Sequence, residues 1–257
     1  GVAQTLGRLA TTPGSAPPLH LEEMVERVQK HRRIDLAPEQ KDAVSAALKE
    51  KILIITGGPG TGKTTIVSCI LDLYRGLGAR VLLMAPTGRA AKRLTETTGG
   101  EATTIHRALE WSPQTGGFKR NPTDPLKAEV VVVDEMSMVD TYLMYHLTRA
   151  IPLQARLILV GDAHQLPAVG PGSILKDLLD SGAVKSVRLT QIYRQARASL
   201  IVVNAHRINQ GVFPILPRQG VGRDFAFIEL EEPEALKQES LKLVEQDLPR
   251  RFGFDPM

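Results

Sequence analysis

The chain has 257 residues, of which 42% are hydrophobic and 23% charged, so it can form one large or two modest globular domains. No run approaches the roughly 18 consecutive apolar residues of a membrane helix, and the first residues lack the pattern of a secretory signal. A net charge of +4 is compatible with a polyanionic partner but does not indicate one. With 4% aromatic residues, a broad base-stacking platform is not expected.

The first segments in chain order are expected to lead into a larger domain. Residues 11–18, TTPGSAPP, have the composition of a linker. Residues 21–33 repeat apolar side chains at helical spacing, and a second helix is expected over residues 36–48, with Pro38 in its first turn. We therefore expect residues 1–35 to be a linker and a helix that precede the domain.

From residue 51 onward, short apolar runs alternate with helical segments. Continuous apolar strands that alternate with helices argue for an α/β fold, with a parallel sheet covered on both faces. Ligands of such sheets bind at the carboxyl ends of the strands. The expected strands are residues 51–56, 80–85, 129–134 and 156–161, and the expected helices are residues 63–77, 88–97, 141–150 and 172–182.

The pattern changes after residue 190, which indicates the start of a second domain. A helix near residues 197–210, a strand over 224–230 and a helix over 233–248 are expected there. We expect the domains to span residues 36–190 and 191–257, the second one incomplete. The first residue is not Met, and we expect the chain to be a fragment of a longer protein.

A glycine-rich loop follows the first expected strand and matches G-x-x-x-x-G-K-[ST]. Its backbone N–H groups and the dipole of the next helix can hold phosphates, and the alternative is an ordinary glycine turn. Lys63 would contact the β- and γ-phosphates, and the hydroxyl of Thr64 would bind Mg²⁺. The predicted nucleotide-binding loop comprises Gly57, Gly58, Pro59, Gly60, Thr61, Gly62, Lys63, Thr64 and Thr65.

Two adjacent carboxylates, Asp134 and Glu135, end the run VVVVDE. Four preceding valines indicate burial, and buried neighbouring carboxylates need a cation. Asp134 would therefore hold Mg²⁺ through water, and Glu135 would orient and deprotonate the attacking water. The alternative is a solvated strand end. Together with the loop, the pair predicts an Mg²⁺-dependent nucleotide hydrolase of the P-loop type.

The chain resembles superfamily-one DNA helicases of the RecD-like branch in several motifs that occur in the same order. Besides the glycine-rich loop and the acidic pair, these motifs are the segments LAPEQKDAV, APTGRAAKRL and LVGDAHQLPAVGPGS. The resemblance runs from about residue 36 to residue 211. It implies a RecA-like P-loop domain followed by the start of a second one. It also implies that Gln165 senses the γ-phosphate and that Gln40 reads the adenine. A loop amide and an exposed helix glutamine are the respective alternatives.

The same resemblance implies a track for single-stranded DNA. For Arg89, Lys92 and Arg93 the alternative is a solvated charged face of a helix. For His106 the alternative is a structural histidine. By the same resemblance, the segment LTQIYRQA implies that Arg194 is an arginine finger, and a surface arginine is the alternative. It also implies that Tyr193 contacts the adenine, and a core tyrosine is the alternative. The predicted DNA-binding residues are Pro86, Thr87, Arg89, Lys92, Arg93, Thr104 and His106.

Structural roles are predicted for two other residues, Trp111 and Cys69. Trp111 could stack on a base, but packing is the favoured interpretation, and Cys69 is expected in the core. A single cysteine cannot form an internal disulfide, which favours a reducing, cytoplasmic compartment. His164 lies in a variable position of its motif and is assigned no chemistry.

The resulting hypothesis is an ATP-dependent DNA helicase that moves 5′ to 3′ on single-stranded DNA in repair or recombination, with ATP and Mg²⁺ as cofactors. Its expected partners are single-stranded DNA, duplex junctions, the remainder of its own chain and repair proteins, with no membrane. A DNA-dependent ATPase that remodels without unwinding, a small-molecule P-loop kinase and a non-enzymatic scaffold are the alternatives. Two motifs of the second motor domain are missing, so the chain alone is expected to bind Mg²⁺·ATP but to hydrolyse it weakly.

Overall fold

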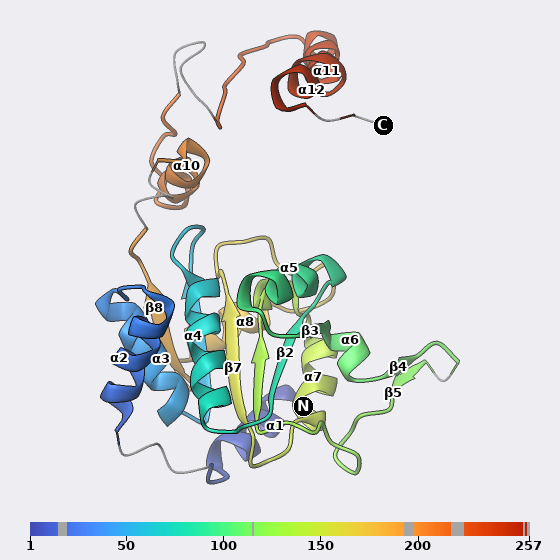
Figure 1. The fold of residues 1–257 in the computed structure, drawn as a ribbon. Coiled ribbons are helices and arrows are strands. Elements are labelled where there is room, and N and C mark those ends of the chain that lie inside the picture. Colours follow the sequence, from blue (N-terminus) through green and yellow to red (C-terminus); the bar gives the residue numbers. More distant parts are fainter. Residues whose placement is uncertain (15–19, 115, 193–197, 217–223, 254, 256–257) are drawn as a thin grey trace. The chain divides into compact units, whose positions relative to one another are not determined.

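The computed structural model describes the chain except residues 15–19, 115, 193–197, 217–223, 254 and 256–257. The chain forms two compact units, Gly1–Ala198 and Ser199–Met257, and each is described by itself. The predicted phosphate loop and acidic pair both lie in the first unit (Figure 1).

A six-stranded sheet forms the centre of the first unit. Its strand order is β3-β2-β6-β7-β1-β8, and each neighbouring pair is parallel. Parallel neighbours need crossover connections, and here helices supply them. The predicted α/β fold with a parallel sheet is therefore confirmed. The strands are β1 (Ile52–Gly57), β2 (Val81–Ala85), β3 (Ala102–Thr104), β6 (Val130–Val133), β7 (Arg156–Gly161) and β8 (Lys185–Leu189).

Helices cover both faces of this sheet, with a separate hydrophobic core under each layer (Figure 1). Successive side chains of a strand point to opposite faces of the sheet. In β1, Leu53 and Ile55 therefore belong to one core, whereas Ile52 and Ile54 belong to the other. The first core contains residues of α2 (Leu21–Arg32), α3 (Pro38–Lys49), α4 (Lys63–Gly76) and α5 (Gly88–Thr98). The second contains residues of α1 (Val2–Thr11), α6 (Ile105–Ala108), α7 (Thr141–Ala150) and α8 (Ile174–Ser181).

Helix α1 was not predicted from the sequence, yet it is part of the second core. Leu6 and Leu9 are 5% and 1% exposed, and the hydroxyls of Thr5 and Thr148 lie 2.8 Å apart. The short apolar pattern of this helix precedes a linker composition, so residues 1–35 were expected to be only a linker and one helix. Its burial against α7 makes it an integral part of the first unit.

Replacing Leu9 with alanine is expected to lower the free energy of unfolding of the first unit by about 2–5 kcal/mol, because a fully buried leucine leaves a cavity. Arg8→Ala, an exposed position on the same helix, is the matched control and is expected to change it by less than about 0.5 kcal/mol. Chemical denaturation measures both. Equal effects of the two variants would show that α1 does not pack on the core.

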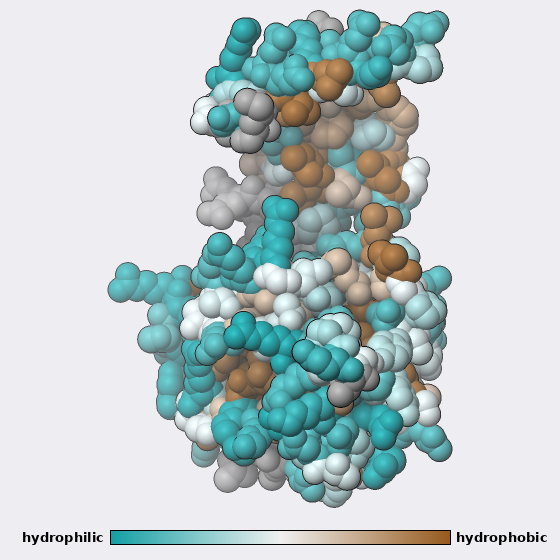
Figure 2. Space-filling model, turned by 90° about the vertical axis from the view of Figure 1, so that its right-hand side faces the viewer, coloured by the Kyte–Doolittle hydropathy of each residue, from teal (hydrophilic) through white to brown (hydrophobic). Residues whose placement is uncertain are grey.

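The second unit contains α10 (Leu200–Asn209), α11 (Pro233–Lys242), the π-helical turn η2 (Leu243–Asp247) and α12 (Leu248–Phe252). The predicted strand over residues 224–230 is wrong, because those residues form no strand and no described strand lies beside them. No apolar side chain is buried among the described residues of this unit, and apolar side chains are exposed on its surface (Figure 2).

Among the described residues, no helix is both long and apolar enough to cross a membrane. The single cysteine, Cys69, is buried in α4 as predicted. Burial raises the pKa of its thiol to about 11, so the thiol stays protonated at neutral pH.

Candidate active site

The glycine-rich loop turns from the end of β1 into the start of α4. Gly60 and Gly62 have φ angles of 74° and 84°, a conformation that glycine adopts without steric cost. A Cβ on Gly57 would lie 2.6 Å from the Thr61 hydroxyl oxygen and 2.9 Å from the Leu189 carbonyl oxygen. The glycines are thus required by the backbone itself, and the loop opens at the N-terminus of a 14-residue helix.

Lys63 lies across this loop. Its ammonium donates hydrogen bonds to the carbonyl oxygens of Gly57, at 2.6 Å, and Gly58, at 3.0 Å. Burial lowers the pKa of Lys63, and the charges of Asp162, Asp134 and Glu135 oppose this shift. A half-buried cation among carboxylates is suited to receive the phosphates of a nucleotide.

Gln40 lies behind the loop and is 2% exposed. Its amide nitrogen donates to the Thr61 carbonyl at 3.1 Å, and its amide oxygen accepts from the Ala37 backbone N–H at 3.1 Å. The structure therefore places Gln40 as a support of the phosphate loop, and it is not among the residues that line the cavity described below. Its adenine contact stays a prediction.

The acidic pair follows β6. In an extended strand, adjacent side chains point to opposite faces. Glu135 instead has a φ of 54°, and this left-handed turn lets Asp134 and Glu135 line the same cavity. Burial raises the pKa of Asp134, and the neighbouring Glu135 charge adds to this. A pair of carboxylates in this state is stabilised by a cation.

The loop after β7 brings Gln165 to the acidic pair. The amide oxygen of Gln165 accepts a hydrogen bond from the Ser137 hydroxyl at 3.2 Å. Asp162 is buried, and its carboxylate accepts from the His164 backbone N–H at 2.9 Å. Sequence reasoning missed Ser137, although its place two residues after Glu135 was a usable signal.

These elements converge on one cavity of about 800 Å³ at the carboxyl ends of β1, β6 and β7. The phosphate loop, Asp134, Glu135 and Gln165 all line it, together with the apolar side chains of Ile34 and Leu36, which sequence reasoning missed. Three neighbouring strands thus present a phosphate cradle, two carboxylates and an amide to one space, which fits the rule that ligands bind at this edge.

The cavity also fits Mg²⁺. Thr64 and Asp134 both line it and offer a hydroxyl and a carboxylate oxygen, the hard donors that Mg²⁺ prefers. Among the described residues, no cluster of three or more His, Cys, Asp or Glu side chains is placed to hold a metal ion. Mg²⁺ in nucleotide sites binds through one or two protein side chains plus phosphates and water, and Thr64 and Asp134 offer that number of donors.

The chain matches the AAA domain family over residues 40–171, a little over half of its length. The chain belongs to this family. It is 42% identical over 187 residues to the ATP-dependent RecD2 DNA helicase of Deinococcus radiodurans, covering 73% of this chain and 26% of that protein. It is 40% identical over 166 residues to the RecBCD enzyme subunit RecD of Mycolicibacterium smegmatis, covering 55% of this chain and 30% of that protein.

A solved structure agrees with these relatives. The Pif1 helicase of Candida albicans is 25% identical, with a TM-score of 0.52, over 70% of this chain and 45% of that one. The predicted resemblance to RecD-like helicases and the RecA-like P-loop fold are therefore confirmed. The chain spans about a quarter to a third of the length of the two sequence relatives.

Outside the cavity of this AAA domain, the other predicted DNA-binding residues lie at or after the carboxyl ends of β2 and β3, in the turn after β2, in α5, at the end of β3 and in α6. Thr87 and Thr104 cap helices α5 and α6, accepting hydrogen bonds from the Ala90 and Arg107 backbone N–H groups. Each threonine therefore has a structural role whether or not it binds DNA. Pro86 is half-buried, whereas Arg89, Lys92 and His106 are exposed.

His106 belongs to a cluster of rings, defined here as His106, Phe118, Tyr142 and His146. The ring centroids of His106 and Phe118 are 5.7 Å apart, and those of Phe118 and His146 are 4.8 Å apart. Tyr142 lies 4.6 Å from His146 and is 51% exposed. Such rings offer stacking surfaces for bases. The sequence did not show this cluster, because α6, β5 and α7 are brought together only by folding.

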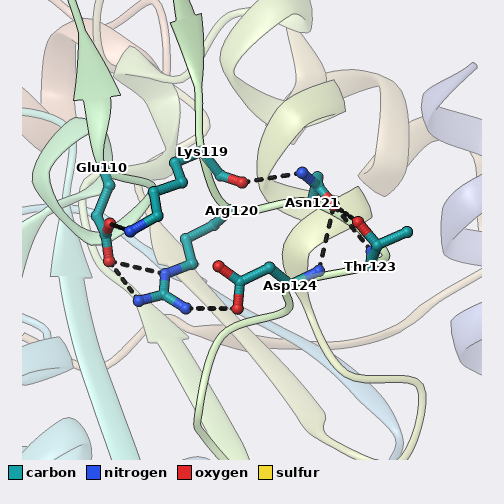
Figure 3. Close-up of polar contacts among 6 residues, drawn as sticks. All are labelled: Glu110, Lys119, Arg120, Asn121, Thr123 and Asp124. Atoms are coloured by element: carbon teal, nitrogen blue, oxygen red, sulfur yellow. Dashed lines mark hydrogen bonds and ion pairs between the residues drawn. The ribbon is translucent and has the colours of Figure 1, made fainter.

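A short antiparallel hairpin, β4 (Trp111–Ser112) and β5 (Gly117–Phe118), lies beside the cluster. Its base is held by Glu110, which pairs with Arg120 and, at 3.0 Å, with Lys119 (Figure 3). Arg120 also donates to the Asp124 carboxylate at 2.9 Å. Trp111 is 45% exposed, and its packing role stays a prediction.

The Glu110 pairing is expected to make the hairpin pH-dependent. Hydrogen bonds from Lys119 and Arg120 lower the pKa of Glu110 in the folded chain. The stabilisation is therefore present above the ordinary pKa of glutamate, about 4.3, and is lost as pH falls through the lowered value. Because Trp111 is the single tryptophan, its acrylamide quenching should rise over this pH range while circular dichroism stays constant.

Glu110→Gln is the control for that measurement. The variant should show the higher quenching at all pH values, since a neutral amide cannot form the ion pairs. If the wild-type step persists in Glu110→Gln, another group controls the hairpin.

Two predicted residues, Tyr193 and Arg194, lie outside the residues that the structure describes. The chain leading to them is anchored at Thr190, whose backbone N–H and hydroxyl donate to Glu39 at 2.7 and 2.5 Å. The Thr190 hydroxyl is the main cause that lowers the pKa of Glu39. Helix α3, which supplies Gln40 to the phosphate loop, thus also holds the end of the last strand.

Proposed function

We propose that this chain is the first motor domain, with the start of the second, of an ATP-dependent DNA helicase. One observation carries the proposal: Lys63, Asp134 and Glu135 line a single cavity with Gln165, at the edge of a RecA-like sheet. The sequence relatives are named as helicases or as a subunit of a RecBCD enzyme, which supports the assignment.

In this proposal, the phosphate loop and Lys63 hold the β- and γ-phosphates of ATP. Thr64 and Asp134 would hold Mg²⁺, which neutralises phosphate charge when bound. Glu135 accepts a proton from the attacking water, and Gln165 contacts that water or the γ-phosphate. Because Gln165 is held by the neutral hydroxyl of Ser137, it can exchange that partner when phosphate arrives or leaves.

Single-stranded DNA would lie across the carboxyl ends of β2 and β3, near Pro86, Thr87 and Thr104. Arg89 and Lys92 would meet its phosphates, and the ring cluster would meet its bases. We propose 5′-to-3′ movement and a role in DNA repair or recombination, because the chain resembles the RecD-like branch, and a cytoplasmic location, because a single cysteine favours a reducing compartment. The exposed apolar side chains of the second unit would be covered by further parts of the same protein. Duplex junctions and repair proteins would be its other partners.

The test is the rate of ATP hydrolysis with and without a single-stranded oligonucleotide, beside strand displacement on a tailed duplex. A helicase motor predicts DNA-stimulated hydrolysis in the protein that contains both motor domains, and weak hydrolysis by this chain alone. Hydrolysis that is indifferent to DNA would contradict the proposal. Stimulation without strand displacement would favour an ATPase that remodels DNA without unwinding it.

A further inference from the structure

The basic residues of α5 do not share one environment. Ala90, Arg93, Leu94 and Thr97 line the nucleotide cavity, whereas Arg89 and Lys92 do not. At 3.6 residues per turn, the four lining residues fall within an arc of about 100° around the helix, and Arg89 and Lys92 fall outside it. One face of α5 therefore forms a wall of the cavity, and Arg93 lies on that face.

Arg93 has no counter-charge of its own in the described part of the chain. No carboxylate among those residues lies within ion-pair distance of its guanidinium, whereas the neighbouring Lys92 lies 4.0 Å from Glu96. A guanidinium is always charged and presents donors in a planar fork that fits phosphate oxygens. An unpaired arginine on the wall of a phosphate-binding cavity is a site for an anion.

The surroundings of Arg93 locate it along the cavity. Its charge contributes to lowering the pKa of Lys63 and opposes the rise in the pKa of Asp134. Both of these groups lie at the end of the cavity where the phosphate loop meets the acidic pair. The charge of Arg93 therefore acts on the groups at the phosphate end of the cavity.

We propose that Arg93 is a phosphate-binding residue for the nucleoside triphosphate and not part of the DNA track. This inference rests on the proposed nucleotide-binding function of the cavity. Arg93 and Lys63 then contact the phosphates from two helices, α5 and α4. Lys63 supplies a point charge from the start of α4, and Arg93 supplies a planar fork of N–H donors from the cavity wall.

The experiment is a titration of the chain with Mg²⁺·ATP and, separately, with adenosine. Arg93→Ala is expected to weaken Mg²⁺·ATP binding about ten-fold or more, the effect of losing a charged hydrogen bond, and to leave adenosine binding unchanged. Because Arg93 is exposed and alanine favours helices, the variant should fold normally. Arg27→Ala, which removes the same charge from an exposed position on α2, is the matched control and should bind Mg²⁺·ATP as the wild type does.

Single-stranded DNA affinity completes the test. Lys92→Ala is expected to weaken DNA binding, and Arg93→Ala is expected to weaken it less. If Arg93→Ala binds Mg²⁺·ATP as tightly as Arg27→Ala does and loses DNA affinity as Lys92→Ala does, the inference is wrong while the proposed function stands. If the wild-type chain binds no Mg²⁺·ATP, the proposed function itself fails.

Discussion

Replacing Glu135 with glutamine is expected to lower the rate of ATP hydrolysis by about 100- to 10,000-fold, the usual contribution of a general base. Mg²⁺·ATP should still bind, because Lys63, Thr64 and Asp134 are unchanged. Glutamine keeps the size of the side chain but cannot accept a proton from water. Single-turnover hydrolysis by the protein that contains both motor domains, in the presence of single-stranded DNA, measures the rate, and equilibrium titration measures binding.

Glu129→Gln is a matched control for this experiment. Glu129 directly precedes β6, at the end opposite to Glu135, and its side chain is 56% exposed and paired with Arg80. The control should hydrolyse ATP at the wild-type rate. A Glu135→Gln variant as fast as Glu129→Gln would show that another group activates the water.

Replacing Lys63 with alanine is expected to weaken Mg²⁺·ATP binding by about 10- to 100-fold, since a charged contact to phosphate is worth roughly 1.5–3 kcal/mol. DNA-stimulated hydrolysis should disappear with it. Within the described part of the chain, the Lys63 ammonium donates hydrogen bonds only to two carbonyl oxygens of its own loop. The fold should therefore survive the substitution.

An exposed lysine on a neighbouring helix separates the role of Lys63 from a general effect of charge. Lys49→Ala, at the end of α3, should leave nucleotide affinity unchanged. Unaltered Mg²⁺·ATP affinity in Lys63→Ala would place the nucleotide elsewhere on the chain.

The phosphate loop and the acidic pair could be predicted from the sequence because each directly follows a buried strand. A run of apolar residues fixes where the strand ends, and parallel strands bring their carboxyl ends to one edge. Lys63 and Glu135, far apart in the chain, were therefore expected to meet. The left-handed turn at Glu135, which lets both carboxylates reach the cavity, has no signal in the residue type itself.

Other parts of the site depend on packing that the sequence does not show. Three basic residues of α5 look equivalent at spacings of three and four, but the way α5 lies against the phosphate loop decides that Arg93 lines the cavity. The ring cluster is assembled from three separate segments. The predicted strand over residues 224–230 failed because a strand needs a partner, and β-propensity does not supply one.

Amide hydrogen exchange of the wild-type chain, with and without a non-hydrolysable Mg²⁺·ATP analogue, tests whether this cavity binds the nucleotide. We expect the analogue to slow exchange in the phosphate loop, residues 58–65, and at the turn after Asp134. Exchange in the second unit should not change. Binding of the analogue without protection of residues 58–65 would contradict the assignment of this cavity as the nucleotide site.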